Sequence, residues 1–122
     1  IIDAFERVVT CPGLQTTTIA TFSDNVYDGD VVTNIDTQNA KYIRITNISA
    51  ISADMELAVV GTTNYMVHMP AGYSHIICRT DDAMLTEADD SPSFGTMGDI
   101  ENIQARPTAG ADVLVEIFVA SA

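Results

Sequence analysis

The chain has 122 residues, of which 47% are hydrophobic, so it can bury one core and is too apolar to be disordered. Its 17 acidic residues against 5 basic ones give a formal net charge of −12. Such a charge repels phosphate backbones and anionic lipid surfaces, which argues against nucleic-acid or membrane binding and favours docking onto a basic patch of a protein.

The first twelve residues form a segment distinct from the single domain that we expect over residues 13–122. This segment is rich in apolar side chains and lacks the basic and long apolar regions of a signal peptide. It is either an arm that adds a strand to a neighbouring chain or an ordinary edge strand of the same domain. The sequence leaves both interpretations open. The apolar positions that we expect to make contacts are Ile1, Ile2, Phe5 and Val8.

Short stretches of alternating or β-branched residues follow, separated by turn residues. Strands are predicted at 16–23, 41–47, 55–59, 65–69, 74–79, 100–105 and 112–120, with another short one at 31–33. Pro, Gly, Asn and Asp mark the turns between them. Because no window of helical length shows a 3.6-residue period, we expect an all-β fold, an antiparallel β-sandwich or jelly roll in one domain.

The last predicted strand has the clearest alternation. Its odd positions from Val113 to Val119 are apolar and share one face, while Leu114 and Phe118 lie on the other face. Apolar side chains on both faces indicate that the outer face is also covered, by a second layer or by a neighbouring subunit. We therefore add Leu114 and Phe118 to the candidate protein-interface residues.

The sequence contains no recognisable catalytic signature. His75 and Cys78 are three residues apart in a predicted strand, so their side chains point to opposite faces, and His68 has no nucleophile in a known spacing. Cys11 and Cys78 lack the spacing of metal ligands, and we expect two free thiols. We predict that the protein is not an enzyme and has no catalytic residues, cofactor or metal site.

Two local patterns suggest a binding module of a different class. Residues 70–75 are similar to the second cupin motif, Pro-x-Gly-x-x-His, but the first motif with its His-x-His is missing, so a hairpin turn is the stronger interpretation. The acidic residues of 81–90 offer oxygens to calcium but lack EF-hand spacing, which favours a solvated loop. The alternative is a small carbohydrate- or metal-binding jelly roll that uses His68, His75 and the acidic loop.

From Ala40 to the C-terminus, the order of strands and turns resembles that of small structural proteins of tailed bacteriophages. The resemblance starts with the strand and Asn-rich turn at 41–49 and continues through the strand pair around 61–65 and the turn at 70–74. It ends with the strands at 100–105 and 113–119. Proteins of this kind are β-sandwiches that decorate capsids or occupy tail and neck positions, usually as homo-oligomers.

The resemblance implies a virion structural protein, a capsid decoration (cement) subunit synthesised in the host cytoplasm and placed on the capsid surface. It implies self-association, as a homotrimer, and contact with the major capsid protein or another virion protein that stabilises the shell by mass action. A tail, neck or fibre component is the alternative within the same class.

Overall fold

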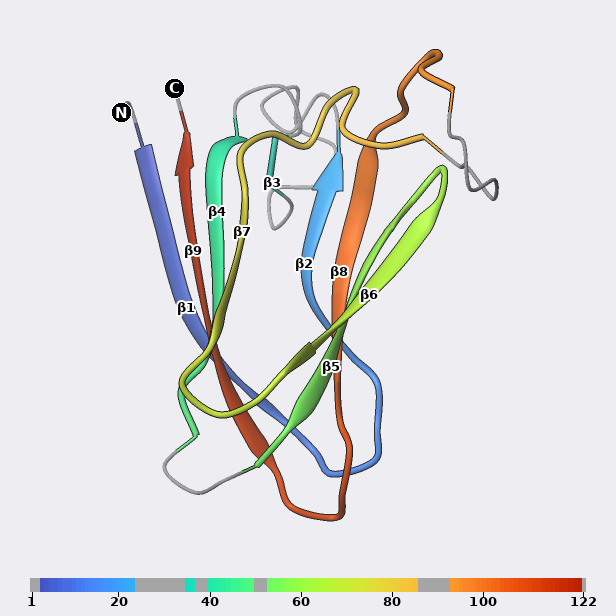
Figure 1. Cartoon of the computed structure of the whole chain (residues 1–122). Helices are drawn as coiled ribbons and strands as arrows, with labels where there is room; N and C mark the ends of the chain where they lie inside the picture. The colour runs from blue at the N-terminus through green and yellow to red at the C-terminus, as the bar shows by residue number, and fades with distance from the viewer. Residues whose placement is uncertain (1–2, 24–34, 37–39, 50–52, 86–92, 122) are drawn as a thin grey trace.

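The strands predicted from the sequence lie in two packed sheets in a computed structural model, which describes residues 3–23, 35–36, 40–49, 53–85 and 93–121 (Figure 1). The described residues form an all-β sandwich in a single domain, as the alternation of the sequence predicted. Within these ranges there is no helix with the length and apolar character needed to span a membrane.

Nine strands are present in the described residues. They are β1 (Asp3–Cys11), β2 (Thr17–Ser23), β3 (Ile35–Asp36), β4 (Ala40–Asn47), β5 (Met55–Gly61), β6 (Asn64–Met69), β7 (Ser74–Ile77), β8 (Ile100–Pro107) and β9 (Val113–Ser121). The seven longer predicted strands are confirmed as β2 and β4–β9, with small differences at their ends. The short strand predicted at 31–33 lies outside the described residues.

One sheet has four strands in the order β1-β9-β4-β7, and the other has five in the order β3-β2-β8-β5-β6. All pairings are antiparallel except that of the two-residue strand β3, which lies parallel to β2. Strands β4 and β9 are neighbours in one sheet, and β5 and β8 in the other, although each pair is far apart in sequence. The central pairings of both sheets are therefore between strands that are distant in the sequence.

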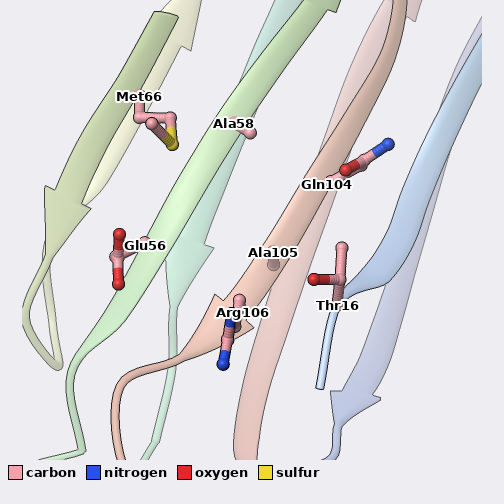
Figure 2. Close-up of a pocket in the computed structure, with 7 residues that line it drawn as sticks. All are labelled: Thr16, Glu56, Ala58, Met66, Gln104, Ala105 and Arg106. Atoms are coloured by element: carbon pink, nitrogen blue, oxygen red, sulfur yellow. The ribbon is translucent and has the colours of Figure 1, made fainter. Parts of the chain in front are cut away.

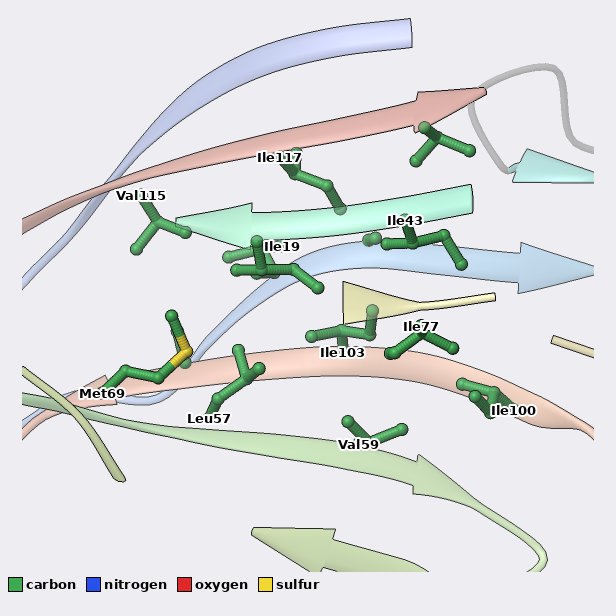
Figure 3. Packing of buried hydrophobic residues seen from close by; sticks show 14 of the residues in the cluster. Ile19, Ile43, Leu57, Val59, Met69, Ile77, Ile100, Ile103, Val115 and Ile117 are labelled. Carbon is green, nitrogen blue, oxygen red and sulfur yellow. The ribbon is translucent and has the colours of Figure 1, made fainter. Parts of the chain in front are cut away.

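The core lies between the sheets and is built from every second side chain of the strands (Figure 3). In β9 the four odd-numbered residues from Val113 to Val119, which the sequence places on one face, are the buried set. The other buried side chains of the core come from strands of both sheets. They include Ile19, Ile43, Ile45, Leu57, Val59 and Ile103, all with no exposed surface.

Strand β1 is an edge strand of the four-stranded sheet. It pairs with β9 over its whole length, from Asp3 opposite Ser121 to Cys11 opposite Val113.

The turn after β1 is held against the turn between β8 and β9, because Gly13 donates its N–H to Asp112 Oδ1 at 3.0 Å. A Cβ atom at Gly13 would lie 2.3 Å from the backbone of Gly110, so only glycine permits this approach.

Candidate interaction surface

The side of the four-stranded sheet that faces away from the core is called the outer sheet face below. The strand register sets which residues lie side by side on it. Phe118 of β9 lies opposite Glu6 of β1 on one side and Arg44 of β4 on the other, and Arg44 in turn lies opposite Ile76 of β7. Each row of this face therefore takes one residue from each of the four strands.

Large apolar side chains are exposed on the outer sheet face. Val8 of β1 is 52% exposed, Ile76 of β7 51% and Leu114 of β9 41%. They come from three strands, including both edges of the sheet. A single exposed apolar residue is common in soluble proteins, but a group on one sheet face is typical of a protein–protein contact.

The centre of the outer sheet face is a group of aromatic and charged side chains. Arg44 Nη2 lies 3.5 Å from Glu116 Oε1, and the guanidinium carbon of Arg44 lies 5.4 Å from the centroid of the Phe118 ring. Tyr42 packs edge-on against Phe118, with the ring centroids 6.1 Å apart. Because these contacts fix the four side chains against one another, the centre of the face is ordered before any partner binds.

The structure brings together three of the six predicted interface residues. Val8, Leu114 and Phe118 lie on the outer sheet face. Phe5 lies opposite Val119 and packs against the core while half-buried, so it belongs to the inner side of β1. Ile1 and Ile2 lie outside the described residues. Ile76 also lies on this face and was not among the predicted residues, because its neighbour Ile77 is apolar too and alternation does not say which of the two faces the core.

The outer side of the five-stranded sheet has a shallow hollow of about 210 Å³ (Figure 2). It forms over Ala58, whose small side chain lies between the opposing Gln104 and Met66. Sites for drug-sized molecules usually measure about 300–1,000 Å³, so this hollow is smaller than a typical ligand pocket. The residues that line it are Thr16, Glu56, Ala58, Met66, Gln104, Ala105 and Arg106.

The two histidines proposed for a binding module lie on different sheets. His68 of β6 has its Nε2 atom 3.2 Å from Asp54 Oδ2, whereas Nε2 of His75 in β7 lies 2.9 Å from the Tyr65 hydroxyl. In the acidic loop, Arg79 donates to Asp81 Oδ2 at 2.8 Å, and 86–90 lie outside the described residues. Among the residues that are described, no three His, Cys, Asp or Glu side chains are grouped to bind a metal ion.

The hydrogen bond between Tyr65 and His75 predicts a pH dependence of stability. Burial lowers the pKa of His75 from its usual 6.5 and raises that of Tyr65. The unprotonated nitrogen of a neutral imidazole can accept a hydrogen bond, whereas both nitrogens of a protonated imidazole can only donate. As pH falls below about 6.5, the unfolded chain gains a proton on this histidine more readily than the folded chain, so the contribution of His75 to stability is lost.

This effect is measured as the melting temperature at pH 7.5 and pH 5.5 for the wild type and for His75→Gln. The wild type should lose more of its melting temperature between the two pH values than the variant does. Equal losses in the two proteins would show that His75 titrates alike in the folded and unfolded states.

The remaining candidate positions have structural explanations. Cys11 is buried and Cys78 is exposed, and both are free thiols. Asn47 begins a glycosylation sequon, but its side chain has no exposed surface and its Nδ2 atom donates to the carbonyls of Ala53 and Met69 at 2.8 and 3.0 Å. An amide nitrogen with both hydrogens engaged inside the fold is not open to modification in the folded chain.

No family model matches this chain, and comparisons with curated proteins and with solved structures found no similar protein.

Proposed function

We propose that this protein is a virion structural protein, a capsid decoration subunit that binds the shell through its outer sheet face. The observation that carries the proposal is the group of exposed apolar side chains, Val8, Ile76 and Leu114, around the ordered centre of that face. Aromatic residues and arginine are enriched in the buried centres of protein interfaces, and Phe118, Tyr42 and Arg44 occupy that position here.

The side chains of the outer sheet face contribute little to the stability of the isolated chain and are available for binding. Arg44 and Glu116 are partly exposed, at 39% and 27% of their side chains, so their ion pair contributes less than about 1 kcal/mol to folding. On contact with a partner, the same pair loses water and becomes directional. Covering the exposed parts of the three apolar side chains contributes roughly 1 kcal/mol each.

The resemblance to bacteriophage structural proteins points to a capsid protein as the partner. The net charge of −12 indicates that the partner's surface is basic. A shell surface that presents basic side chains would attract this chain, and the outer sheet face would then give the contact its specificity. Sedimentation of the native source tests this directly: the protein should travel with capsids that lack tails. Presence on tails alone would instead support the tail or neck alternative.

Leu114→Glu should weaken binding to purified shells at least tenfold, as measured by co-sedimentation over a range of concentrations. The change replaces an exposed apolar side chain of the proposed contact with a charge that must be desolvated on binding, and tenfold corresponds to about 1.4 kcal/mol. Met66→Glu is the matched control because Met66 is 71% exposed on the opposite sheet and the variant has the same net charge. If both variants bind as the wild type does, the outer sheet face is not the contact.

A further inference from the structure

Within the described residues, β1 pairs with β9 on one side only, and its other edge is regular and has few of the features that usually block strand addition. Its pairing with β9 runs from Asp3 to Cys11 without the register shift that interrupts the β4–β9 pairing. The strand contains no proline and no lysine. In Figure 1, β1 is the outermost strand of its sheet, and one of its sides faces away from the rest of the sandwich. Along residues 5–11, such an edge can offer backbone groups to another strand.

The charged side chain at the centre of β1 points inward, a feature that can limit strand addition, but here it is engaged with the facing sheet. Arg7 lies on the inner side of the strand, opposite Ile117, and its Nη2 atom donates to the backbone carbonyl of Ile19 in β2. The guanidinium group is therefore held toward β2. The outer side of β1 near its middle is formed by Glu6 and Val8, of which Val8 is 52% exposed.

We infer that β1 pairs with β1 of a second copy of this chain, antiparallel and around a two-fold axis at Val8. An antiparallel two-fold pair keeps the outer faces of both copies on the same side. Directly opposed residues must then come from the same face, so the axis passes through a residue position. Most of β1 can pair only when the axis lies near the middle of the strand, at Glu6, Arg7 or Val8.

The side chains select among these three positions. An axis at Glu6 or at Arg7 places two like charges directly opposite each other, which is destabilising. An axis at Val8 places the two valines opposite each other, with Glu6 opposite Thr10 and Arg7 opposite Val9. This register pairs residues 5–11 of both copies without a like-charge contact. It also places the two Val8 side chains beside each other on the outer sheet face, where Val8 is the most exposed large apolar residue.

The pairing has a consequence for the outer sheet face. Two four-stranded sheets joined at β1 form one continuous eight-stranded sheet, so the outer faces of both copies lie on the same side. Leu114 and Phe118 of both copies would then contact one target surface. Binding of the first copy would raise the effective concentration of the second copy at that surface. An isologous contact closes at two copies, whereas the trimer implied by the sequence resemblance requires a head-to-tail contact.

Charge exchange at the axis tests this inference. Val8→Lys and Val8→Glu should each be monomeric, because each variant places like charges opposite each other across the axis. An equimolar mixture of the two should restore a dimer, because lysine then lies opposite glutamate. Light scattering after size exclusion should give twice the 13.1 kDa chain mass for the wild type and for the mixture. Native mass spectrometry should show that the restored dimer contains one copy of each variant.

The opposite edge of the same sheet provides the control. Ile76 of β7 is 51% exposed on the same face, so Ile76→Lys and Ile76→Glu introduce the same charges at a matched site and should leave the dimer intact. Melting curves establish that all four variants fold. A wild type that stays monomeric or is trimeric overturns the inference, as does a Val8→Lys variant that stays dimeric or a mixture that stays monomeric. These outcomes are independent of shell binding, which sedimentation measures separately.

Discussion

Asn47→Ala should lower the free energy of unfolding by about 3 kcal/mol, a large share of the stability of a domain of this size. Asn47 is fully buried at the end of β4, and its side chain satisfies three backbone groups. Nδ2 donates to the carbonyls of Ala53 and Met69, while Oδ1 accepts the N–H of Ser49 at 3.2 Å. Alanine removes all three hydrogen bonds, of which the one to Met69 is buried and the other two are partly buried.

The same residue joins segments that are distant in the sequence. Its backbone N–H donates to the carbonyl of Tyr73 at 3.1 Å, and its carbonyl accepts the N–H of Gly72 at 2.7 Å. Asn47 therefore holds the turn at 70–73 and the segment before β5 against the end of β4. Losing the side chain should loosen this end of the sandwich, which hydrogen exchange at the Ser49 amide would detect.

Urea unfolding of Asn47→Ala measures the loss, with two further variants for comparison. Asn47→Asp keeps the size of the side chain but directs an acceptor at the two carbonyls, so it should be at least as destabilising as alanine. Asn102→Ala removes a half-buried amide on β8 whose Oδ1 accepts from Gln104 at 3.1 Å, and it should cost less than about 1 kcal/mol. If Asn47→Ala cost no more than Asn102→Ala, Asn47 would not organise this end of the fold.

The two-residue alternation was sufficient to predict the fold class and most strands, because the inner positions of this sandwich are almost entirely apolar. In β4 the alternating residues Ile43 and Ile45 are buried, while Tyr42 and Arg44 lie outside. The order of strands in the sheets was not predictable in the same way. It depends on pairings such as that of β4 with β9, which no local pattern encodes.

The candidate surface was predicted only in part, for a reason visible in two strands. In β1 both Phe5 and Val8 are apolar, and only the pairing with β9 shows that Phe5 points inward and Val8 outward. In β7 the neighbours Ile76 and Ile77 are also both apolar, and Ile77 is the buried one. Where both faces of a strand carry apolar residues, alternation separates the two sets but does not say which set faces the core.

Ile117→Ala should lower the free energy of unfolding by about 3–4 kcal/mol, because it opens a cavity at the centre of the sandwich. Ile117 has no exposed surface, and its strand β9 is paired on both sides, with β1 and with β4. Figure 3 shows its side chain near Ile43 and Val115 in the packed interior. The surrounding strands are fixed by their ladders and can close only part of the space.

Leu114→Ala is the matched control, since Leu114 lies on the same strand but on the outer sheet face and is 41% exposed. It should cost only about 1 kcal/mol, because Leu114 is already partly in contact with water and its truncation opens no enclosed cavity. Denaturant unfolding of the two variants therefore measures the difference between the two faces of one strand. Similar costs would mean that the outer sheet face is packed in the isolated chain as tightly as the core, and the exposed surface on which both proposals depend would not exist.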